Sequence, residues 1–86
     1  IQWLSEFSNL IITRTFSKAY GLAGLRVGYS LCSPLIADFI NRVREPFNVN
    51  FTAQVAAIAA LRDDDYLSES IKVNSDGYEQ LVECFK

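Results

Sequence analysis

The sequence contains no histidine and no methionine, and it has only two cysteines, two prolines and one tryptophan. Without histidine, the chain alone cannot supply a Ser–His or Cys–His catalytic pair or a histidine metal ligand, and lysine is the obvious remaining nucleophile. Cys32 and Cys84 lack the paired spacing of a zinc site, and two buried, reduced thiols are favoured over one disulfide. Without an initiator methionine, the sequence is expected to be a piece of a longer protein.

The chain also has only a small excess of negative charge and no long apolar run. The net charge is −2 and the basic residues are scattered, so a nucleic-acid partner is not expected. The apolar runs end well before the roughly 18 residues that would suggest a membrane span, and no signal peptide is visible. These features suit a cytoplasmic protein without a membrane partner. Half of the residues are hydrophobic, which is enough for a packed core.

Two hydroxyls, a lysine and an arginine lie together in one glycine-punctuated segment. Thr15 and Ser17 come just before Lys18, and Arg26 follows it closely. A lysine can form an imine with an aldehyde, and hydroxyl and guanidinium groups can hold a phosphate. This inventory suits a phosphorylated aldehyde cofactor, and no metal ligand set accompanies it.

Each of these residues also has an ordinary structural explanation. Most lysines lie on the surface, an arginine at a strand edge can pair with an acid, and hydroxyls can close local turns. A Walker phosphate loop is excluded, because it needs glycine before the lysine and Ser or Thr after it. Here Ser17 precedes Lys18 and Ala19 follows it.

The pattern of residues predicts two strands followed by three helices. The segment 9–14 is short, apolar and β-branched, which predicts a buried strand. Residues 25–31 predict a second strand that is interrupted at Gly28, and Gly21 and Gly24 mark the loop between the strands. Two strands cannot form a stable sheet alone, so a larger α/β protein is expected.

Helix signals follow the second strand. Ser33 provides a hydroxyl cap before a proline, Asn50 or Thr52 can cap the second helix, and aspartates favour the start of the third. An apolar stripe on the third helix is broken at Asn74. The three helices are expected at residues 34–44, about 50–62 and about 64–86.

The stretch TRTFSKAYGLAGLRVGY resembles the cofactor-lysine region of the class I/II aminotransferases, most closely the histidinol-phosphate aminotransferase branch. The likeness extends more loosely through NRVREPFNVN to the helical end of the chain. The resemblance implies a fragment of the large domain of a fold-type I transferase that depends on pyridoxal 5′-phosphate. Residues 1–86 would contribute two strands of a mainly parallel sheet, the cofactor-lysine loop and helices leading toward the small domain.

The same resemblance implies roles for individual residues. Lys18 would form the covalent bond to pyridoxal 5′-phosphate and move protons, while Thr15, Ser17 and Arg26 would hold the cofactor phosphate. The reaction would convert L-histidinol phosphate and 2-oxoglutarate to imidazole-acetol phosphate and glutamate, in histidine biosynthesis, in a homodimer. The acid that pairs with the cofactor ring and the substrate arginines would lie outside this chain, so the chain alone is expected to be inactive.

Two other interpretations remain open. The first is another enzyme of the same fold, such as an aromatic aminotransferase or a threonine-phosphate decarboxylase, although the run Phe47–Asn50 favours the histidinol-phosphate branch. The second is a non-catalytic α/β piece. In the family, the loop corresponding to residues 44–50 reaches toward the partner's active site. For Arg44 and Asn50, a solvated helix-end arginine and a helix cap are favoured over substrate contact.

Overall fold

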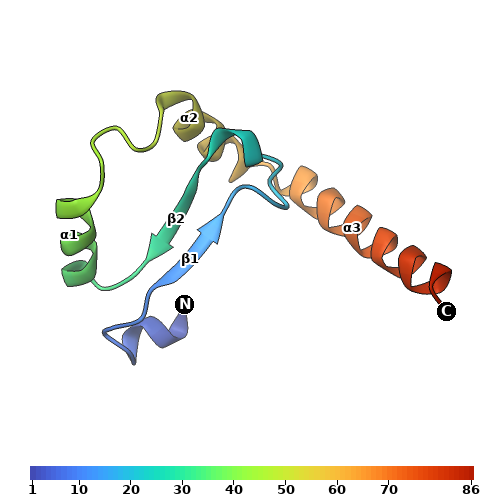
Figure 1. Ribbon diagram of the computed structural model, residues 1–86, viewed down its shortest axis with the longest axis horizontal. Coiled ribbons are helices and arrows are strands. Elements are labelled where there is room, and N and C mark those ends of the chain that lie inside the picture. Colours follow the sequence, from blue (N-terminus) through green and yellow to red (C-terminus); the bar gives the residue numbers. More distant parts are fainter.

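The computed structural model describes residues 1–86, and Figure 1 shows an open arrangement with the last helix extending away from the rest. The expected order of strands before helices is confirmed, with short 3-10 turns added. In chain order the elements are η1 (Gln2–Ser5), β1 (Ile12–Thr15), η2 (Ala23–Leu25), β2 (Gly28–Leu31), α1 (Pro34–Val43), α2 (Phe51–Ala60) and α3 (Asp64–Cys84).

The two strands pair with each other in antiparallel orientation. Their register places Ile12 opposite Leu31 and Thr15 opposite Gly28. A parallel pair would need a crossover connection, usually an α-helix, whereas these strands are joined by a loop that contains only η2. This pair therefore does not display the mainly parallel sheet that was expected.

Both strands are shorter than the sequence predicts. β1 begins at Ile12, and its residues are half-buried or exposed, so the prediction of a buried strand is wrong for this chain. The reason is that no helix packs broadly against the strand pair, whose extensive contact is that between the two strands themselves. β2 begins only at Gly28, because Leu25 ends η2 and Arg26 adopts a left-handed backbone with φ 53°.

The helices lie where the sequence predicts them, within a few residues at each end. Asn50, and not Thr52, caps α2: its Oδ1 accepts a hydrogen bond from the N–H of Ala53 at 2.8 Å. Ser33 occupies the cap position of α1, but its hydroxyl makes no capping hydrogen bond, so proline at the first turn starts this helix.

The core is very small and joins the lysine segment to α2. Phe16 is 3% exposed, and its ring contacts the rings of Tyr20 and Tyr29 at centroid distances of 5.0 and 5.7 Å. Half of the sequence is hydrophobic, yet the expectation of a packed core is met by only four buried residues: Phe16, Val27, Ala53 and Ala57.

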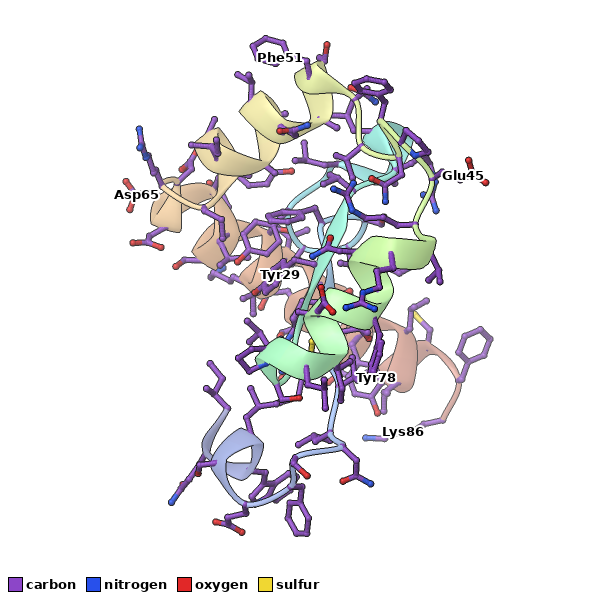
Figure 2. All side chains as sticks on the ribbon, turned by 90° about the vertical axis from the view of Figure 1, so that its left-hand side faces the viewer. Tyr29, Glu45, Phe51, Asp65, Tyr78 and Lys86 are labelled. Carbon is purple, nitrogen blue, oxygen red and sulfur yellow. The ribbon has the colours of Figure 1, made fainter.

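Most of the apolar side chains therefore face outward. Phe51 points outward from the start of α2, as Figure 2 shows, and Tyr78 on α3 is also exposed. Cys32 is half-buried and Cys84 is exposed, and both are free, so the expected burial of the thiols is wrong for Cys84 at the end of α3. None of the helices combines the length and apolar character that crossing a membrane requires.

Candidate active site

The lysine lies in a closed turn that follows β1 directly. Phe16 donates its N–H to the carbonyl of Val27 at 3.2 Å, so the strand pairing continues one residue into the turn. Gly21 donates to the carbonyl of Lys18 at 2.8 Å, and Leu22 donates to the carbonyl of Phe16 at 2.9 Å. These bonds and the buried Phe16 ring fix the backbone on both sides of Lys18.

A polar hollow of about 370 Å³ opens beside this turn, at the end of the strand pair. Its lining carries two guanidinium groups and three hydroxyls and no carboxylate, which is a composition suited to an anion. The lining residues are Thr13, Arg14, Thr15, Ser17, Arg26, Val27 and Gly28.

The hydroxyl of Thr15 is oriented by the backbone of the turn. Ser17 donates its N–H to Thr15 Oγ1 at 3.0 Å, which occupies an acceptor site on that oxygen and leaves the hydroxyl hydrogen available to a ligand. Arg26 donates from Nη1 to the carbonyl of Ala23 at 2.8 Å, so η2 holds one edge of the guanidinium group. The remaining N–H groups of Arg26 are available to an anion.

Gly28 is required where the two strands approach most closely at the hollow. A Cβ atom at this position would lie 2.7 Å from the carbonyl oxygen of Arg14, which is too close without a shift of the backbone. Since Gly28 pairs with Thr15, any side chain there would separate the strands beneath the hydroxyl. The glycine thus preserves the hollow as well as the strand pair.

Lys18 does not line this hollow. It is exposed and lines a second hollow of about 360 Å³, formed with Ala19 and with Ser70, Ile71 and Asn74 of α3. The ion pairs of the structure join other residues, so Lys18 has no charged partner. Of the four residues predicted for the cofactor site, the structure therefore brings Thr15, Ser17 and Arg26 together and directs Lys18 elsewhere.

The loop between α1 and α2 has a structural explanation within the chain. Arg44 donates from Nε to Asn41 Oδ1 at 2.8 Å and from Nη1 to Asn48 Oδ1 at 3.1 Å. Asn50 serves as the helix cap described above. Phe47 has a left-handed φ of 58° and is 96% exposed, a strained position that the sequence did not reveal.

A family model for the class I and II aminotransferases matches residues 1–86. The chain belongs to the aminotransferase class I and II family. This match covers the lysine turn, the polar hollow and all three helices, and it agrees with the resemblance carried by the segment around Lys18.

Curated relatives place the similarity within one branch of the family. Histidinol-phosphate aminotransferase from Methylobacillus flagellatus is 60% identical over 81 residues, which are 94% of this chain and 22% of the relative. Histidinol-phosphate aminotransferase 2 from Ralstonia nicotianae is 53% identical over 85 residues, or 99% of this chain and 23% of the relative. Histidinol-phosphate aminotransferase 2 from Pseudomonas fluorescens is 54% identical over 86 residues, which are 100% of this chain and 23% of the relative. The chain thus spans less than a quarter of these relatives.

Proposed function

We propose that this chain is part of an enzyme that uses pyridoxal 5′-phosphate to transfer an amino group from L-histidinol phosphate to 2-oxoglutarate. The products are imidazole-acetol phosphate and L-glutamate, and the reaction is a step of histidine biosynthesis. The observation that carries the proposal is the hollow lined by Thr15, Ser17 and Arg26, in the same segment as Lys18, in a chain 53–60% identical to histidinol-phosphate aminotransferases.

The hollow fits the phosphate group of the cofactor. Arg26 supplies a fork of N–H donors with a permanent positive charge, and Thr15 and Ser17 supply hydroxyl donors. No carboxylate in the lining would repel a phosphate. In this proposal these three residues bind the phosphate and thereby fix one end of the cofactor against the lysine turn.

Lys18 is the proposed catalytic residue. When bound, pyridoxal 5′-phosphate supplies a ring that accepts electrons from the substrate. Lys18 would hold the cofactor through its Nζ atom until the amino group of the substrate displaces it. The freed Nζ would then take the proton from the substrate α-carbon and deliver it to C4′ of the cofactor. Because Lys18 is exposed and has no charged partner, its flexible side chain can turn from α3 toward the hollow without breaking an ion pair.

We further propose that residues 1–86 form part of the large domain of a fold-type I transferase, with α3 leading toward the small domain. The two strands would then join a mainly parallel sheet in the longer protein, which would act as a homodimer in the cytoplasm on small-molecule substrates. The exposed faces of the strand pair support this, since a two-stranded sheet needs further strands or helices for stability.

The test uses the complete protein loaded with pyridoxal 5′-phosphate and mixed with L-histidinol phosphate in the absence of any keto acid. We expect the visible absorbance of the lysine-bound cofactor to disappear as the amino group is transferred. Lys18→Ala lacks this absorbance from the start, and its formation of imidazole-acetol phosphate should be about a thousandfold slower or more, because the acid–base group is lost. Lys72→Ala is the matched control, since Lys72 pairs with Asp76 on the outer surface of α3.

Different failures of this test have different meanings. Absorbance that is present but unchanged by histidinol phosphate would reject this substrate and retain the cofactor and Lys18. A complete protein that binds no cofactor at Lys18 would reject the enzyme itself.

A further inference from the structure

α3 contacts the lysine turn at a point that the proposed reaction does not explain. Gly21 closes this turn with φ 69°, and a Cβ atom built on it would lie 2.5 Å from the hydroxyl oxygen of Tyr66. The next nearest atom, Cζ of the same ring, would lie at 3.5 Å, which is an ordinary contact. The Tyr66 hydroxyl therefore lies directly against the backbone of the residue that closes the turn.

The backbone of Tyr66 is fixed at the start of α3. Its N–H donates to Oδ1 of the cap residue Asp63 at 2.9 Å, which fixes the first turn of the helix. One turn further along, Ser70 lines the hollow around Lys18 together with Asn74. The same helix thus borders the lysine turn on two sides, once at Gly21 and once at Lys18.

The backbone links Gly21 to Lys18 directly. The N–H of Gly21 donates to the carbonyl of Lys18 at 2.8 Å, so any displacement of Gly21 either moves the lysine or breaks this bond. The backbone before Lys18 is anchored by the buried Phe16 and by its bond to Val27. On the other side, Leu22 donates its N–H to the carbonyl of Phe16 at 2.9 Å, and Gly21 is the residue of this closure that meets α3.

We propose that Tyr66 is a positioning residue that sets the place of Lys18 through Gly21. This inference rests on the proposed role of Lys18 in binding the cofactor. Tyr66 is 51% exposed, so it contributes little to the core, and its contact with Gly21 serves the geometry of the turn. The hydroxyl limits how far the turn can open toward α3, which keeps the lysine backbone at a fixed distance from the polar hollow.

The test compares four variants of the complete protein: Gly21→Ala, Tyr66→Phe, the double variant, and Gly24→Ala as a matched control. Gly24 lies in the same loop, but a Cβ atom there meets nothing within 4 Å of it, and its φ is not positive. The readouts are the fraction of Lys18 that borohydride fixes to pyridoxal 5′-phosphate, measured by peptide mass, and the pH midpoint of the visible absorbance of the bound cofactor. The midpoint of thermal unfolding is measured alongside.

Below saturation with cofactor, we expect Gly21→Ala to lower the fraction of Lys18 fixed by borohydride about tenfold, through the contact with Tyr66 and the left-handed backbone. Tyr66→Phe in that background should recover part of the loss, because the methyl group then meets only the ring at an ordinary distance. Gly24→Ala should match the parent protein. Suppose that the parent protein binds the cofactor normally at Lys18, but the double variant fixes no more cofactor than Gly21→Ala does. This result would overturn the positioning role of Tyr66 and leave the proposed function intact.

A second variant tests the same link without adding strain. Tyr66→Ala removes the ring, and we expect a shifted pH midpoint of the cofactor absorbance and a lower kcat with little change in the unfolding midpoint. An unchanged absorbance and kcat would contradict the positioning role. If the parent protein itself does not load at Lys18, the proposed function fails and the inference fails with it.

Discussion

Arg26 combines several properties that are unusual in an exposed residue. Its φ of 53° is left-handed, its guanidinium group is tied to the carbonyl of Ala23, and its side chain lines the polar hollow. Non-glycine residues in this conformation store strain and tend to persist where the surrounding structure requires them, often at functional sites. The geometry of Arg26 therefore supports a binding role more strongly than its position in the sequence does.

Replacing Arg26 by glutamine should weaken cofactor binding in the complete protein. Loss of a charged, forked hydrogen bond to phosphate is expected to raise the Kd for pyridoxal 5′-phosphate by about tenfold to a hundredfold. The measurement is a titration of the apoprotein followed by absorbance. Arg62→Gln is the control, because Arg62 lies after α2 and outside the hollow. Equal affinities for the two variants would contradict the role of Arg26.

The residues that line the site were predictable from the sequence, whereas side-chain directions and contacts between distant segments were not. Thr15, Ser17 and Arg26 were identified from their chemistry and from a family resemblance, and the structure places them together. The direction of the Lys18 side chain was not predictable, because it depends on α3, which is distant in the sequence. The contact between Gly21 and Tyr66 was hidden for the same reason, and only the place of Gly21 in the loop between the strands could be predicted.

Helices α1 and α2 begin in two different ways. At α2 the side chain of Asn50 accepts a backbone N–H, whereas at α1 the hydroxyl of Ser33 makes no such bond and proline leads the helix. Both positions carry residue types that favour capping, so sequence alone treats them alike. Only the side-chain geometry separates a cap that stabilises its helix from one that merely occupies the position.

The two caps should differ when they are truncated. Asn50→Ala is expected to lower the free energy of unfolding by about 1 kcal/mol, because the N–H of Ala53 loses its acceptor. Ser33→Ala should change it by less than about 0.5 kcal/mol. Chemical denaturation of the complete protein provides the comparison, with Asn50→Asp as the control that retains an acceptor. Equal losses at both positions would show that the difference in capping has no energetic consequence.

Element boundaries were predictable where capping and proline signals are local. The three helices lie close to their predicted bounds because those signals occur within a few residues of each end. The strands were predicted too long, since apolar β-branched residues continue past the point where a partner strand ends. Burial of β1 was overestimated for a related reason: a strand is buried only when another layer covers it.

At the scale of the whole molecule, the chain is much more open than a compact domain of its length. Its radius of gyration is 16.8 Å, whereas a compact domain of this length would have about 12 Å. Its accessible surface is 7385 Å², compared with about 5,100 Å² for a compact monomer of this size. Together with the many exposed large apolar side chains, both values indicate surface that a compact domain would bury.

The isolated 86-residue chain should therefore behave as an incompletely folded molecule. We expect strong binding of the dye ANS, a broad thermal transition without cooperative unfolding, and no transamination of L-histidinol phosphate. The complete protein serves as the control for all three measurements. A sharp cooperative transition or efficient transamination by the isolated chain would show that it needs no further partner surface.

The long helix α3 has a mechanical consequence. It runs without a break from Asp64 to Cys84, which corresponds to about 30 Å at the rise of an α-helix. Its first turns border the lysine turn, while its far end extends away from the rest of the chain (Figure 1). Because the start of α3 contacts Gly21, we expect a displacement of its far end, near Phe85, to change the tilt of the helix against the lysine turn.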